Sequence, residues 1–207
     1  MVKYKKEKER AKLKPKEKLM KYLIENKGSV SIRHASGAIS VDYKNTYNAV
    51  IDLQASGAIT QKSIGNIRPI EINLFLNKDL YGAEQIRTEE FLLKNPKLKL
   101  IRKDIEEVGY PFMIVVVFGS YVKNTKTEDS DIDICIISDN KEKTKKLTQS
   151  LNLLSLKFEI HEFTTDEFVS MVKQTQNNLG HEIIKSNVIL YGTENYYNLI
   201  SKWMKKE

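Results

Sequence analysis

Two apolar stretches in the middle of the chain constrain its fold more than any other feature. Residues 113–118 are all apolar, and residues 132–137 are apolar except for Asp133. Runs of this length that are rich in Val and Ile are typical of strands buried on both faces. Because both faces of such a sheet need a cover, we expect helices on each side of it.

Helix and strand patterns continue on both sides of these stretches. Helices are expected over about 97–108, ending at Gly109, and then over 141–154, near 168–172 and over 196–203. Further strands are expected over 155–163 and 187–192. In the first of them, Leu156, Phe158 and Ile160 alternate with the polar side chains of Lys157, Glu159 and His161. The order of elements predicts an α+β fold.

The N-terminal part of the chain shows a different pattern. Helices are expected over 16–26, over 31–39 and from Asp42, a plausible N-cap, to Gly57. Tyr47, Val50 and Leu53 are expected to point inward in the third helix. Two alternating runs joined by Gly65-Asn66 then predict a hairpin. We therefore expect a basic arm (1–13), a helical domain with a hairpin (14–76), a linker helix (77–97) and the sheet domain with its C-terminal helices (98–207).

The stretch "IRHASGAISVDYKNTYNAVIDLQASGAI" and the elements around it resemble a winged helix-turn-helix domain over roughly residues 14–76. The resemblance implies DNA binding, with the start of the third helix in the major groove and the hairpin on phosphates. Such a fold also serves as a platform for dimers or for protein partners. The residues implied to contact DNA are Tyr43, Lys44, Asn45, Asn48, Lys62 and Arg68.

The positive charge is concentrated at the N-terminus. Residues 1–21 carry ten Lys or Arg against three Glu, which accounts for the whole net charge of +7. The remainder carries as many basic as acidic side chains, so long-range attraction to a polyanion has to come from the arm. The apolar run over 113–118 is too short to span a bilayer, and the N-terminus lacks the apolar segment of a secretory signal. We expect a cytoplasmic protein with no membrane contact.

Asp131 and Asp133 form an unusual pair beside an apolar run. Alternate side chains of a strand share a face, so the two carboxylates are expected to point the same way. Two like charges held side by side are unfavourable unless a cation or a hydrogen-bond network compensates them. The pair therefore predicts a functional site.

An apolar strand, Gly119-Ser120, ten intervening residues and Asp131-Ile132-Asp133 together resemble the minimal nucleotidyltransferases of the DNA polymerase beta superfamily. The resemblance covers about residues 98–200 and implies a mixed sheet flanked by helices. It implies that Gly119, Ser120 and Ser130 bind the nucleotide, and that Asp131 and Asp133 are catalytic and hold Mg²⁺. ATP is the expected substrate.

The superfamily also uses a third carboxylate on a neighbouring strand, which acts on the attacking hydroxyl. Glu159 is the best candidate because it lies on the polar face of its strand, although the superfamily more often has Asp there. Glu162 is the off-face alternative. If neither acts, the domain binds nucleotide without turnover.

These features favour a nucleotidyltransferase that moves an NMP to an acceptor hydroxyl and carries a DNA-binding domain. The acceptor could be a partner protein, an RNA end or a small molecule. The ten-residue gap resembles the antitoxin nucleotidyltransferases that adenylylate a partner toxin, which favours a protein acceptor. Alternatives are a transcriptional regulator that only senses nucleotide, and a homodimer or docking platform with no DNA role.

Overall fold

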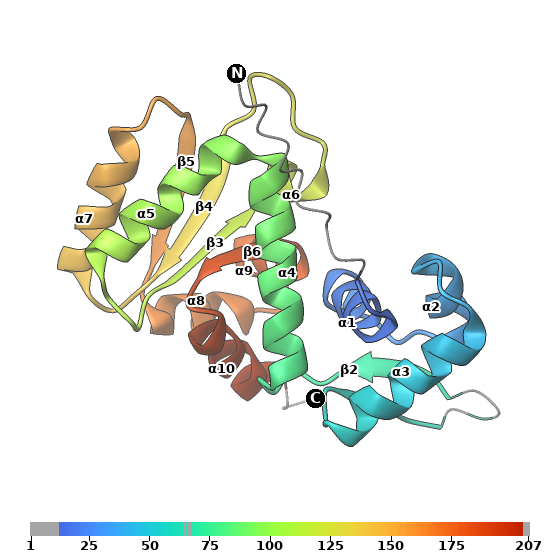
Figure 1. Cartoon of the computed structure of the whole chain (residues 1–207). Helices are drawn as coiled ribbons and strands as arrows, with labels where there is room; N and C mark the ends of the chain where they lie inside the picture. Colours follow the sequence, from blue (N-terminus) through green and yellow to red (C-terminus); the bar gives the residue numbers. More distant parts are fainter. Residues whose placement is uncertain (1–12, 64, 66–67, 205–207) are drawn as a thin grey trace, which may run out of the picture.

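The computed structural model describes residues 13–63, 65 and 68–204. Most of the predicted basic arm and Asn66 of the predicted turn lie outside these residues. The N-terminal part, called here the N-terminal module (residues 13–76), has helices followed by a two-stranded antiparallel sheet (Figure 1). Its elements are α1 (Pro15–Asn26), α2 (Ile32–Ala38), α3 (Tyr43–Ala55), β1 (Ile59–Gln61) and β2 (Ile70–Ile72).

Side-chain caps begin two of these helices, and one of them, Asp42, was predicted. The Ser31 hydroxyl accepts the His34 N–H at 3.2 Å, and Asp42 Oδ1 accepts the Asn45 N–H at 2.9 Å. Both bonds satisfy donors that the first turn of a helix leaves unpaired. α1 ends at Asn26, and the next residue, Lys27, caps it with a left-handed φ of 43°.

The inward face of α3 differs from the prediction at one position. Val50 and Leu53 are buried as expected, but the Tyr47 side chain is 46% exposed. Thr46 and Ala49 are buried instead. The buried stripe of this helix therefore runs through positions 46, 49, 50 and 53. Tyr47 lies on the outer face, where its ring stacks on that of Tyr43 with 6.3 Å between the ring centroids.

The helix α4 (Lys78–Lys94) lies between the N-terminal module and the large sheet (Figure 1). It packs against α1 on one side and β6 (Asn187–Tyr191) on the other. Thr88 Oγ1 donates to the Ile189 carbonyl at 2.8 Å, and Arg87 donates to the Asn187 carbonyl at 2.7 Å. The helix thereby satisfies carbonyls on the outer edge of a strand that would otherwise be open to pairing.

The large sheet has the strand order β5-β4-β3-β6. β3 pairs antiparallel with both β4 and β6, whereas β4 and β5 are parallel, so the sheet is mixed as predicted. Every residue of β3 is buried. The strands are β3 (Ile114–Phe118), β4 (Ile132–Ile137), β5 (Phe158–Phe163) and β6.

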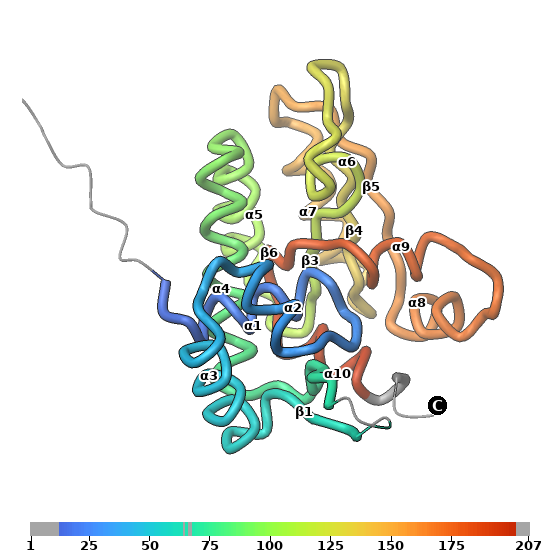
Figure 2. The backbone as a smooth tube through the Cα atoms, turned by 90° about the vertical axis from the view of Figure 1, so that its right-hand side faces the viewer, coloured from blue at the N-terminus to red at the C-terminus, as the bar shows by residue number. Residues whose placement is uncertain are grey.

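Helices cover both faces of this sheet. One face shares an apolar core with two helices, α5 (Lys99–Val108) and α7 (Lys141–Asn152). The short 3-10 helix η1 (Pro96–Leu98) precedes α5. The opposite face packs against α8 (Thr165–Val172), α9 (Leu179–Lys185) and α10 (Thr193–Met204). Figure 2 shows α5 and α8 on opposite sides of the strands. The sequence did not lead us to expect α9.

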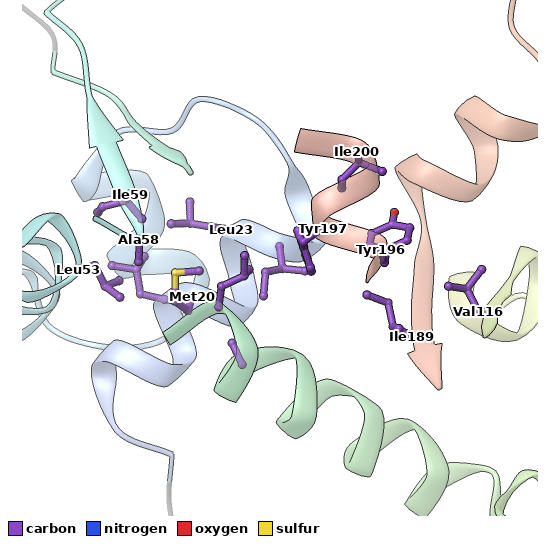
Figure 3. Close-up of a cluster of buried hydrophobic side chains, with 14 of the residues drawn as sticks. Met20, Leu23, Leu53, Ala58, Ile59, Val116, Ile189, Tyr196, Tyr197 and Ile200 are labelled. Atoms are coloured by element: carbon purple, nitrogen blue, oxygen red, sulfur yellow. The ribbon is translucent and has the colours of Figure 1, made fainter. Parts of the chain in front are cut away.

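One apolar core runs from the N-terminal module into the sheet. It joins Met20 and Leu23 of α1 to Tyr196, Tyr197 and Ile200 of α10, as Figure 3 shows. Burial of this continuous core holds the two parts of the chain together. Within the described part of the chain, none of the helices combines the length and the apolar character that crossing a bilayer demands.

Candidate active site

The turn after β3 brings Gly119 against Asp133 of β4. The short helix α6 (Gly119–Lys123) starts directly at the end of β3 (Figure 1). Gly119 has φ 68°, and a Cβ there would lie 2.7 Å from Asp133 Cγ and closer still to its Oδ2. The Asp133 carboxylate accepts the backbone N–H of Ser120. Gly119 therefore makes room for the Asp133 carboxylate. From the sequence, its missing side chain was expected to make room for a phosphate of the nucleotide.

Glu159 faces Asp133 across the parallel strands. The two residues are paired in the register of β4 and β5. Burial raises the pKa of Asp133, and the negative charge of Glu159 raises it further, while the Ser120 N–H acts in the opposite direction. This environment disfavours a second negative charge and would be relieved by a cation.

His161 and Phe118 form one side of the site. His161 Nε2 lies 3.3 Å from Glu159 Oε1, and its ring centroid lies 5.6 Å from that of Phe118. The Glu159 side chain is 59% exposed, so it is accessible to a second molecule. Glu162, the alternative third acid, accepts a hydrogen bond from Thr148 of α7 on the other face of β5, away from Asp133.

Asp131 and Ser130 lie in the loop that leads into β4. Asp131 is exposed and stands one residue before the strand. The Ser130 hydroxyl accepts the Thr127 N–H at 2.8 Å, so it closes the turn that precedes Asp131. Their predicted roles, binding of metal and of nucleotide, remain predictions.

Glu182 is an acid that the sequence analysis missed. It lies on α9, and its charge contributes to the raised pKa of Asp133. Its Oε1 lies 2.6 Å from Lys123 Nζ of α6, with which it forms an ion pair. The available signal was Asn178, whose side chain caps α9 by accepting the His181 N–H at 3.2 Å. The short "LGHEIIK" segment has too few turns for a clear helical period.

The donor chemistry of the site fits Mg²⁺. Among the described residues, no group of three or more His, Cys, Asp or Glu side chains is arranged to hold a metal ion. Mg²⁺ commonly uses one or two carboxylates and takes its other ligands from water and substrate phosphates. Asp131 and Asp133 could supply the two carboxylates.

The residues predicted to contact DNA lie on a separate surface. Tyr43, Lys44, Asn48, Lys62 and Arg68 are exposed. The Asn45 amide donates to Asp42 Oδ2 at 2.6 Å, so it is engaged in the cap of its own helix. An open groove between α2, α3 and the hairpin is lined by Ser31, Ile32, Arg33, Ser36, Tyr43, Tyr47, Gln61 and Arg68.

Comparison with known families bears on the sheet region. Residues 104–196 match the family model described as "Polymerase beta, Nucleotidyltransferase". The match supports the resemblance of this region to the polymerase beta superfamily. It includes all four strands of the large sheet, together with Gly119, Asp133 and Glu159, and it indicates nucleotidyl transfer in general terms. Comparison with curated proteins and with solved structures finds no significant match.

We expect Gly119→Ala to disrupt the candidate active site and to destabilise the protein. The left-handed φ costs about 1–2 kcal/mol for any residue with a Cβ, and the collision with Asp133 adds to that cost. Gly57→Ala is the matched control, because Gly57 has φ 72° but its Cβ would meet nothing within 4 Å. Urea unfolding measures both variants. An equal loss of stability in the two would show that the Asp133 contact is relaxed at no cost.

Proposed function

We propose that the chain transfers a nucleoside monophosphate from ATP to an acceptor hydroxyl in a Mg²⁺-dependent reaction. The observation that carries this proposal is the Asp133 carboxylate, held by the Ser120 N–H against Gly119 and facing Glu159. The family match over residues 104–196 supports it. Bound Mg²⁺ would neutralise charge on the triphosphate and on the leaving pyrophosphate.

Each residue has a defined role in this proposal. Gly119 and Ser120 bind the phosphates, Ser130 orders the loop beside them, and Asp131 and Asp133 hold the metal. Glu159 takes the proton of the acceptor hydroxyl as its oxygen attacks the α-phosphorus. The bond from the α-phosphorus to the bridging oxygen breaks, and pyrophosphate leaves.

Calorimetry with ATP tests the nucleotide site. Wild type should bind ATP in the presence of Mg²⁺, and Asp131→Asn with Asp133→Asn should abolish the Mg²⁺-dependent part because the metal loses both carboxylates. Asp129→Asn is the control, since Asp129 is an exposed acid in the same loop. Unchanged affinity in the double variant would show that these carboxylates do not bind the metal.

A labelling experiment identifies the class of acceptor. A partner protein is our first choice, and RNA ends and small molecules are the alternatives. Incubation of the protein with α-labelled ATP and lysate should transfer the label to one of these classes, which can be separated by size and by protease or nuclease treatment. Nucleotide binding without transfer would favour a sensor over an enzyme.

A second function, DNA binding, is favoured by the groove of the N-terminal module. We infer that helices α1–α3 and the hairpin form a winged helix-turn-helix. The described residues that line the groove include Arg33 and Arg68 and no acidic side chain, and the Tyr43–Tyr47 pair borders it. Guanidinium groups suit phosphates, and exposed aromatic rings suit base edges or sugars. The basic arm would add salt-dependent affinity.

We expect Arg33→Ala with Arg68→Ala to weaken duplex binding. Loss of two phosphate contacts should reduce the slope of log K against log salt by roughly 1.8, at 0.9 for each contact. Anisotropy titrations at several salt concentrations measure the slope. Lys145→Ala with Lys146→Ala is the control, because it removes the same charge from two exposed residues of α7, outside the groove. If wild type binds no duplex at low salt and forms a stable dimer, the docking platform is the better reading.

A further inference from the structure

A charged cavity lies where the N-terminal module meets the sheet. It has a volume of about 380 Å³, and its walls come from α1, α4, α6, the end of α9 and the start of β6. Neither Asp133 nor Glu159 lines it. Two acidic side chains, Glu25 and Glu90, face five basic ones: Lys21, Lys27, Arg87, Lys94 and Lys185.

The cations of this cavity are incompletely neutralised. Lys21 pairs with Glu90, and Arg87 pairs with Glu84 and, at 3.6 Å, with Glu25. In the part of the chain that the structure describes, no carboxylate lies within 4.0 Å of the amino groups of Lys27, Lys94 or Lys185. Lys27 donates to the Ile184 carbonyl. Among the described residues, these three amino groups therefore border the cavity without a carboxylate partner.

Arg87 adds a buried donor. Its side chain is 7% exposed, and its Nε makes no hydrogen bond among the described residues, with the Glu25 carboxylate oxygen 3.6 Å away. Burial, followed by the charge of Arg87, lowers the pKa of Lys27 to about 8. A buried guanidinium and a lysine that oppose each other are compensated best by an anion placed between them.

We propose that this cavity binds a phosphate-bearing anion, either inorganic phosphate or the phosphate of a nucleotide. The guanidinium and amino groups match phosphate in charge and hydrogen bonding, and the volume accommodates a phosphate group with its bound waters. Because the walls come from both parts of the chain, the bound anion stabilises the contact between the N-terminal module and the sheet.

The position of α6 links the cavity to the nucleotidyltransferase site without merging the two. Tyr121, Val122 and Asn124, at and just after the end of α6, line the cavity, while Gly119 at its start contacts Asp133. The anion site stands independently of the proposed transfer reaction, because none of its basic residues has a role in that reaction.

Calorimetry with inorganic phosphate in buffer containing EDTA tests the proposal. Wild type should bind phosphate, and Lys94→Gln with Lys185→Gln should bind it about tenfold or more weakly, because two charged donors are lost. Both lysines are exposed, so the fold should tolerate the change. Lys145→Gln with Lys146→Gln removes the same charge from α7 and should leave the affinity unchanged. A parallel titration with AMP identifies which source of phosphate binds more tightly.

Three results would overturn the proposal: no phosphate binding by wild type, equal weakening in the two lysine pairs, or full phosphate binding in Lys94→Gln with Lys185→Gln. Asp131→Asn with Asp133→Asn separates the two sites. It should leave phosphate binding in EDTA intact even though it removes Mg²⁺-dependent ATP binding. Loss of phosphate binding in Ser120→Ala, with full binding in Lys94→Gln/Lys185→Gln, would place the anion at α6 and contradict the cavity site.

Discussion

Replacing Glu84 by Gln is expected to lower the free energy of unfolding by about 3–5 kcal/mol, the range for breaking a buried ion pair on one side. Glu84 is 1% exposed and accepts hydrogen bonds from Arg87 and from the Tyr197 hydroxyl. Arg87 in turn donates to the Asn187 carbonyl of β6. With Gln at position 84, the Arg87 charge stays buried while its closest anionic partner is lost.

Urea unfolding of the full chain measures this loss. Glu84→Gln combined with Arg87→Met should be milder than Glu84→Gln alone, because no unpaired charge is then buried. Glu90→Gln is the matched control, since Glu90 pairs with Lys21 in a partly exposed position and such pairs contribute about 0–1 kcal/mol. A loss below about 1 kcal/mol for Glu84→Gln would mean that water or Glu25 compensates Arg87.

Replacing Glu159 by Gln is expected to reduce nucleotidyl transfer by about 10²–10⁴-fold, the usual contribution of a general base. The side chain is largely exposed and paired in register with Asp133, where an acceptor hydroxyl could reach it. Gln keeps the shape of Glu but cannot take a proton. The affinity for ATP with Mg²⁺ should change little, because Asp131 and Asp133 supply the metal ligands in our proposal.

Single-turnover transfer of α-labelled ATP to the identified acceptor measures the chemical step. Glu162→Gln serves as the control, because Glu162 lies on the same strand but contacts Thr148 of α7 on the other face. Wild-type rates in Glu159→Gln would remove this residue from the mechanism. Equal losses in both variants would indicate that β5 itself is disturbed.

The sequence was sufficient for features that depend on local patterns. The all-apolar run at 113–118 predicted a strand buried on both faces, and β3 is buried at every residue. Asp42 and Gly57 marked the ends of α3, because capping depends on side chains within one turn. The alternation over 155–163 placed Glu159 on the polar face of β5, since the period of a strand is two residues.

Features that depend on distant residues came only from the tertiary structure. The pairing of Asp133 with Glu159 required the parallel register of β4 and β5, and the role of Glu182 required α9 to pack beside α6. No local pattern marks Arg87 and Glu84 as buried, and they are buried because α4 covers the edge of β6. Local periodicity carries no information about which edge a helix covers, and long-range packing decides where these charges lie.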